Sequence, residues 1–228
     1  MSVSRQDGPG IAQQFAFDAV GDTLGKATDV DACVALAARI NGLMNEALDS
    51  FQNDGAGIAC RAGCSFCCHL RVMIYPHEAI ALFRYLRSRM PKAQADGVRA
   101  RLVGNAAHIG KLAREGRIAT GIACAFLVEG KCGAYEVRPA ACSGYHSLSK
   151  ERCEAAHDSG AASSESIPVL EGLRYVAATL DDGMDQGLAA LGLSGHRVEL
   201  NTAVAALIRD PALIERWRSG RELMKESR

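Results

Sequence analysis

The chain has 228 residues, enough for one substantial hydrophobic core, and its 48% apolar and 23% charged residues are ordinary for a folded protein. Its 26 basic and 26 acidic residues cancel, so no bulk charge draws it to nucleic acid or to an anionic lipid surface. No run approaches the roughly eighteen consecutive apolar residues of a membrane span, and we expect no membrane association.

The first helix that the sequence predicts covers residues 29–53. Thr28-x-x-Asp31 resembles a capping box, and a stripe of apolar residues at helical spacing follows it. Cys33 lies on this stripe, far along the chain from the other cysteines. Because a free cysteine packs like a small apolar side chain, we expect Cys33 in the core.

Two further helices are predicted over 76–90 and 92–115, and the break between them favours an antiparallel helical hairpin. The stretch 84–117 holds nine Lys or Arg residues, whereas 151–187 holds eight acidic ones. The basic stretch could dock an acidic partner or RNA. Since Tyr85 is the single aromatic residue among its charges, solvated helix faces partly neutralised by the acidic segment are the favoured interpretation.

The segment 118–145 is short, punctuated by glycine and contains a proline, and it predicts loops with one small β-hairpin turning at Glu129-Gly130. Residues 158–166 resemble a linker, but one too short to separate two domains. Helices are expected again over 168–191 and 201–208, with one more start at Asp210-Pro211. The predicted fold is therefore a single, mainly α-helical domain over 1–228, with helices packed around a loop-rich cysteine site.

The cysteine spacing is the most informative pattern in the sequence. A disulfide framework needs an oxidising compartment, and the first ten residues lack the apolar core of a secretion signal. We therefore expect a cytoplasmic protein whose thiolates bind zinc, iron or an iron–sulfur cluster. The predicted ligands are the eight clustered cysteines, Cys60, Cys64, Cys67, Cys68, Cys124, Cys132, Cys142 and Cys153.

The first four of these cysteines would share one side of a helix if 60–68 were helical. Adjacent Cys67 and Cys68 would still point about 100° apart, which is awkward for two ligands of one tetrahedral ion. The pair is easier to explain if each serves a different metal or if one of them bridges. Eight ligands would satisfy two four-coordinate centres.

The other four cysteines come from loops, which a bound metal would order. Three arginines, Arg61, Arg71 and Arg138, lie beside cysteines in the sequence and could offset thiolate charge, although the first two are equally well explained as surface residues. With enough sulfur present, we do not assign the neighbouring histidines as ligands: His69, His77, His146 and His157.

A family resemblance rests on several strings in order: Cys60-Arg-Ala-Gly-Cys64-Ser-Phe-Cys67-Cys68, the helix start Tyr75-Pro-His-Glu78-Ala79, Cys124-Ala-Phe-Leu127, and Gly130-Lys-Cys132-Gly-Ala-Tyr135-Glu136-Val-Arg138-Pro139-Ala-Ala-Cys142. Over about 60–145 the chain resembles the YkgJ-type CxxCxxCC family, bacterial proteins described as zinc- or iron-chelating. Two departures stand out: Ala125 where that family usually has Pro, and Ser143 where it usually has Arg.

The resemblance implies that seven of the cysteines hold the metal, whereas Cys153 rests on spacing alone. A related module occurs in flagellin lysine methylases, where an iron–sulfur cluster is implicated. No S-adenosylmethionine motif is recognisable here, so whether the chain is an enzyme is left open. The sequence thus favours a metal-binding protein with a structural or metal-handling role, and the alternative is an iron–sulfur protein with redox or protein-modifying activity.

Overall fold

The computed structural model describes residues 8–25, 29–115, 121–159 and 167–224. This part of the chain is mainly α-helical, as predicted, with two short antiparallel strand pairs. The α-helices are α1 (Gly8–Leu24), α2 (Val30–Asn53), α3 (Pro76–Ser88), α4 (Lys92–Arg114), α5 (Ala140–Ser143), α6 (Lys150–Asp158), α7 (Glu171–Ala190), α8 (Leu200–Arg209) and α9 (Leu213–Arg218). The remaining elements are the 3-10 helices η1 (Phe66–His69) and η2 (Tyr135–Val137) and the strands β1 (Met73–Ile74), β2 (Leu127–Val128), β3 (Lys131–Cys132) and β4 (Val198–Glu199).

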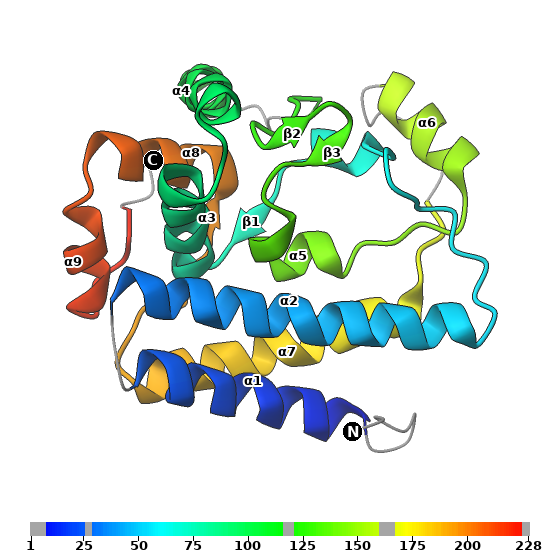
Figure 1. Cartoon of the computed structure of the whole chain (residues 1–228), viewed down its shortest axis with the longest axis horizontal. Helices are drawn as coiled ribbons and strands as arrows, with labels where there is room; N and C mark the ends of the chain where they lie inside the picture. Colours follow the sequence, from blue (N-terminus) through cyan, green and yellow to red (C-terminus); the bar gives the residue numbers. More distant parts are fainter. Residues whose placement is uncertain (1–7, 26–28, 116–120, 160–166, 225–228) are drawn as a thin grey trace.

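Three long helices, α1, α2 and α7, run side by side along the molecule and form one layer (Figure 1). The contact between α1 and α7 is made by small residues. A Cβ atom added at Gly183 of α7 would lie 2.1 Å from the carbonyl oxygen of Gln13, and one at Gly187 would lie 2.8 Å from Cβ of Val20. The two backbones therefore touch, and a side chain larger than hydrogen at either glycine would force them apart.

The predicted helix over 29–53 is confirmed as α2. Its N-cap is Asp29, whose carboxylate accepts a hydrogen bond of 2.8 Å from the N–H of Ala32. Thr28 lies outside the described residues. Cys33 is 2% exposed within the apolar stripe, and burial raises the pKa of its thiol to about 12. The prediction that Cys33 belongs to the core is confirmed.

The helices over 76–90 and 92–115 are confirmed as α3 and α4, but their pairing as an antiparallel hairpin is wrong. After Pro91 the chain changes direction, and α4 packs on α8 while α3 packs between α2 and α8 (Figure 1). The helices do not pair with each other because the apolar stripe of α4, which includes the buried Val98 and Leu102, packs on α8.

The small hairpin is confirmed as β2–β3, with Leu127 paired to Cys132. Its turn has positive φ at both central residues, 50° at Glu129 and 75° at Gly130, as a two-residue hairpin requires. A second pair joins β1 to β4, with Met73 opposite Glu199. This second pair was not predicted, because strands of two residues have no readable periodicity.

Near the C-terminus, α7 and α8 confirm the two predicted helices, whereas α9 begins at Leu213, later than Asp210-Pro211 suggested. The carboxylate of Asp210 accepts a hydrogen bond of 3.1 Å from Ala212 N–H, so it shapes the turn before α9 rather than capping the helix. Helices α1, α5 and α6 were missed. The predicted linker 158–166 lies almost entirely outside the described residues.

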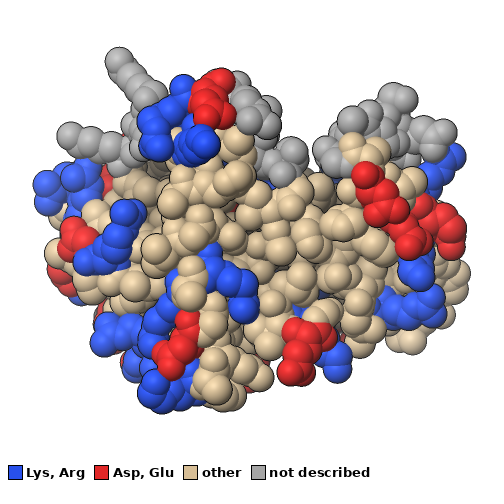
Figure 2. All heavy atoms as spheres, turned by 90° about the horizontal axis from the view of Figure 1, so that it is seen from above, with Lys and Arg blue, Asp and Glu red and all other residues tan. Residues whose placement is uncertain are grey.

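Three basic residues of the stretch 84–117 form ion pairs with two aspartates. Arg84 pairs with Asp31 at 2.9 Å, and Lys92 and Arg99 both pair with Asp96. These three residues pair outside the acidic segment 151–187, and partial neutralisation of the stretch by that segment stays a prediction. Figure 2 shows most of the basic side chains on the left of this face with acidic ones among them, and an acidic group on the right with Lys and Arg beside it, so the two charges are mixed over the surface.

No helix within the described ranges combines the length and apolar character needed to cross a bilayer.

The contact between α1 and α7 yields a matched pair of substitutions. Gly183→Ala should lower the free energy of unfolding by about 2 to 4 kcal/mol, because the new methyl group meets backbone atoms that cannot move aside. Gly104→Ala on exposed α4, where an added Cβ meets nothing within 4 Å, should raise stability by up to about 1 kcal/mol. Urea unfolding measures both, and equal effects of the two changes would contradict the close packing.

Candidate metal centre

The eight clustered cysteines lie in the least regular part of the molecule, around η1, the β2–β3 hairpin, α5 and α6 (Figure 1). All of them are free thiols. Cys60 and Cys64 precede η1, Cys67 and Cys68 lie within it, Cys124 precedes β2, Cys132 lies in β3, Cys142 in α5 and Cys153 in α6.

Residues 60–65 are not helical, so the helical arrangement considered for the first four cysteines is wrong. Gly63 has a φ of 90°, which an α-helix cannot contain, and the N–H of Cys64 closes a turn on the carbonyl of Arg61 at 2.9 Å. Only Phe66–His69 forms a single 3-10 turn. Successive residues of a 3-10 turn lie about 120° apart around its axis, but the thiols of Cys67 and Cys68 hydrogen bond to each other, so the two side chains meet.

Hydrogen bonds bring the two cysteine groups together. Cys124 N–H donates to the carbonyl of Cys68 at 2.7 Å, which ties the start of the second group to η1. Ser147 N–H donates to Sγ of Cys60 at 3.2 Å, and Ser147 accepts through its own carbonyl from Ala59 N–H at 3.0 Å. The first group therefore contacts the second on both of its sides.

The surrounding protein raises the pKa of six of these thiols. The pKa of Cys67 is raised by a hydrogen bond to the thiol of Cys68 and then by burial, and burial raises that of Cys124 to about 11. Burial is likewise the main cause of the raised pKa of Cys60, Cys132, Cys142 and Cys153. Thiolates in such surroundings need a cation beside them, and a soft metal ion supplies it when it displaces the protons.

Arg138 supplies positive charge beside the thiols. Its guanidinium donates to the carbonyl oxygen of Cys142 and lies 5.6 Å from the ring centroid of Tyr135. Its positive charge offsets part of the rise in pKa at Cys67, Cys132 and Cys142. Of the three arginines considered from the sequence, this one faces the thiols.

Arg61 and Arg71 are exposed, as expected of ordinary surface residues.

The two departures from the family pattern have structural explanations. Ser143 is buried and donates to Oδ1 of Asn41 at 2.9 Å, so this position fastens α5 to α2 rather than adding charge. Ala125 N–H donates to Oδ1 of Asn201 at 3.2 Å. A proline at position 125 would remove that donor.

The long helices hold the cysteine loops through amide side chains that sequence reasoning missed. Asn41 of α2 is 4% exposed, and its Nδ2 donates to the carbonyl of Tyr135 at 2.9 Å. On the other side, Asn105 of α4 donates to the carbonyl of Ala123 at 2.8 Å and to Asn201 of α8. Asn41 interrupts an otherwise apolar stripe, a signal that could have revealed it. Asn105 and Asn201 have no such signal.

Arg101 of α4 completes this support. Its guanidinium donates twice to the carbonyl of Ala125, at 3.0 and 2.9 Å, and once to that of Leu127. The basic helix α4 therefore grips the loop that carries Cys124.

The four histidines occupy different surroundings. The rings of His69, in η1, and His157, in α6, meet edge to face with centroids 4.4 Å apart. His77 is fully buried and stacks on Tyr75, and burial lowers its pKa to about 3. Burial also lowers the pKa of His146 to about 4.

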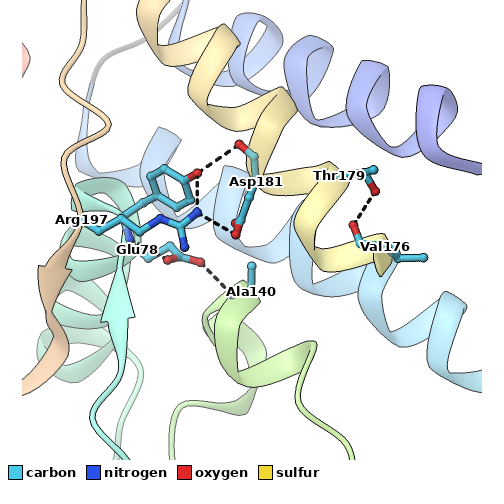
Figure 3. Close-up of polar contacts among 7 residues, drawn as sticks. Glu78, Ala140, Val176, Thr179, Asp181 and Arg197 are labelled. Atoms are coloured by element: carbon cyan, nitrogen blue, oxygen red, sulfur yellow. Dashed lines mark hydrogen bonds and ion pairs between the residues drawn. The ribbon is translucent and has the colours of Figure 1, made fainter. Parts of the chain in front are cut away.

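A buried carboxyl group joins α5 to the helical frame (Figure 3). Glu78 accepts from Tyr75 N–H at 2.9 Å, closing the capping box of α3, and from Ala140 N–H at 2.8 Å at the start of α5. Beside it Arg197 pairs with Asp181 at 2.7 Å. Burial raises the pKa of Glu78 to about 7 despite these hydrogen bonds.

This raised pKa predicts a pH-dependent stability. The folded state keeps the Glu78 proton up to about pH 7, whereas the unfolded carboxyl loses it near its ordinary value of 4.5, so this group's contribution falls as pH rises between those values. Relative to Glu78→Gln, which stays neutral, the wild-type free energy of unfolding should fall by about 1 to 3 kcal/mol over this window. Urea unfolding of both proteins measures this difference, and parallel pH curves would contradict it.

In the part of the chain that the structure describes, no three His, Cys, Asp or Glu side chains are already grouped as ligands of one metal ion. The thiols are near neighbours, and binding would require their side chains to turn toward a common centre.

Comparison with known proteins bears on this site. No curated protein and no solved structure matches the chain. A family model does match over residues 59–160, the part that carries all eight clustered cysteines and includes Cys153. The model is that of the CxxCxxCC family, described as a putative zinc- or iron-chelating domain, to which this segment is similar.

Proposed function

We propose that the clustered cysteines bind zinc or iron and that the metal orders the loops which carry them. The observation that carries this proposal is that eight free thiols lie on separate segments which hydrogen bonds join around η1, from Cys124 to Cys68 and from Ser147 to Cys60. Four-sulfur sites suit both metals. The match to a family described as chelating zinc or iron supports the same conclusion.

The surroundings of the thiols fit a metal. Each metal-bound thiolate loses its proton, and the burial that raises the pKa of Cys67 and Cys142 makes an uncompensated thiolate costly there. A divalent cation and the guanidinium of Arg138 together supply the compensation. The cytoplasm, where thiols stay reduced, is the compartment that we propose for such a site.

An iron–sulfur cluster is the second candidate, because its iron atoms are also held by cysteine thiolates alone. The adjacent Cys67 and Cys68, joined by a thiol hydrogen bond, suit a bridging or paired role in either case. A cluster would add electron transfer to the site's possible chemistry. A redox or protein-modifying activity depends on this second candidate.

Metal content distinguishes the two. Protein purified anaerobically without added metal should be colourless with stoichiometric zinc in the first case, and brown with stoichiometric iron and acid-labile sulfide in the second. Elemental analysis and the visible absorption spectrum provide the measurement. Protein that contains neither metal and binds neither on reconstitution under reducing conditions would contradict the proposed function.

Metal removal should loosen the cysteine loops more than the helical frame. Residues 121–153 bury only two large aliphatic or aromatic side chains, Phe126 and Val137, and would lose the metal that joins their cysteines. Helix α2 keeps the buried stripe that includes Leu36, Ile40 and Met44. Hydrogen exchange with and without a chelator should show protection lost mainly in the loops. Equal loss in α2 would mean that the metal holds the whole fold.

A further inference from the structure

We propose that Glu78 and Asn41 are positioning residues, which hold the short helix that carries Cys142 in place before a metal binds. Neither side chain is a metal ligand in this proposal, and neither has to touch the metal. The inference rests on the proposed function and adds to it the way in which the helical frame prepares one segment of the site.

Helix α5 cannot keep its shape by itself. It is a single turn, Ala140–Ser143, and one turn fixes several backbone dihedral angles for very few hydrogen bonds. Those bonds are local, since the N–H groups of Cys142 and Ser143 both donate to the carbonyl of Pro139 at 2.9 Å. The position of Cys142 therefore depends on contacts between α5 and other elements.

Glu78 holds the start of α5 (Figure 3). Its side chain leaves the first turn of α3, is 3% exposed, and accepts from Ala140 N–H through Oε1 at 2.8 Å. Its other oxygen, Oε2, accepts from Tyr75 N–H at 2.9 Å, so the carboxyl group is itself fixed relative to α3. The first N–H of a helix has no partner within that helix, and here a long helix of the frame supplies one.

Asn41 holds the end of α5. Its Oδ1 accepts from the hydroxyl of Ser143 at 2.9 Å, and its Nδ2 donates to the carbonyls of Tyr135 and Glu136, at 2.9 and 3.4 Å. Because this side chain is 4% exposed, water competes little for these bonds. One buried amide thus joins α2 to both α5 and η2, the elements on either side of Arg138.

Close packing adds a third point of attachment. A Cβ atom added at Gly144, directly after α5, would lie 2.6 Å from Cβ of Ala177 in α7 and 3.7 Å from Cε of Met44 in α2. The backbone at the end of α5 therefore lies against two of the long helices. Cys142 lies between this point and the bond from Ala140 to Glu78.

The segment of Cys60 is attached differently. Ala59 N–H donates to the carbonyl of Ser147, and Ser147 N–H donates to Sγ of Cys60, so these bonds run between loops. A segment that is already in place costs less to order when a metal binds, and the site then binds more tightly. When metal is removed, the segment of Cys142 should keep its place better than that of Cys60.

Alkylation of the metal-free protein tests the placement. The reduced full chain without metal is treated briefly with iodoacetamide, and modification of each cysteine is followed by peptide mass spectrometry. Asn41→Leu, Glu78→Ala and the milder Ser143→Ala should each raise the rate at Cys142 by about tenfold, because each removes a buried hydrogen bond that holds α5. The rate at Cys60 should stay within about twofold of wild type in the same variants.

Gly183→Ala is the matched control, because it should destabilise the protein through the contact between α1 and α7 and leave α5 alone. Its Cys142 should react at the wild-type rate. Cys33, buried in α2, reports global unfolding, and Ser143→Ala decides the test if a larger substitution exposes Cys33 as well. An unchanged rate at Cys142 in Ser143→Ala, or an equal rise in Gly183→Ala, would overturn the proposal.

Metal affinity separates this inference from the proposed function. Competition with a chromophoric chelator measures binding of Zn²⁺, and of Fe²⁺ under anaerobic conditions, to the same proteins. The three variants should bind about 10- to 100-fold more weakly than wild type, as expected when the outer contacts of a metal site are lost, whereas Gly183→Ala should match wild type. Wild-type affinity in all three variants, or in Cys142→Ser, would overturn the positioning role and leave the proposed function standing. Wild type that binds neither metal would overturn both.

Discussion

The cysteine site depends on one constraint, the free-energy cost of burying a negatively charged thiolate inside a protein. A thiol that is partly buried among backbone and apolar groups stays protonated, and bringing several thiolates together there requires positive charge. The raised pKa of Cys67 and of Cys142 shows that these thiols resist losing their protons. Arg138 supplies one positive charge beside them. A soft divalent cation supplies the positive charge that balances the other thiolates.

The helical layer serves to present loops that have little core of their own. Asn41 reaches from α2 to the η2 turn and α5, and Asn105 and Arg101 reach from α4 to the loop before β2. Most of these bonds end on backbone carbonyls rather than on side chains. The frame therefore fixes the path of the chain through contacts in which the thiol side chains take no part.

Elements with a long apolar stripe could be predicted from the sequence, and so could the hairpin, because Glu129-Gly130 provides the turn that its geometry needs. Helix α1 could not be recognised, since its contact with α7 uses alanine and glycine rather than a stripe of large residues. Helices α5 and α6 are too short to show a period. The identity of the clustered cysteines was readable, but their neighbours were not: Ser147 reaches Cys60 across 87 positions, and no local pattern reports such a contact.

The tight crossing of α1 and α7 also bears on how the protein can be handled. Buried residues of α7, among them Leu180, Met184 and Leu188, lie on the helix that α1 covers. Deleting α1 would uncover an apolar groove floored by Gly183 and Gly187, which another hydrophobic segment could enter. Affinity tags and fusion partners therefore belong ahead of Gly8, and shortened versions of the chain that keep only the cysteine domain should be expected to associate with one another.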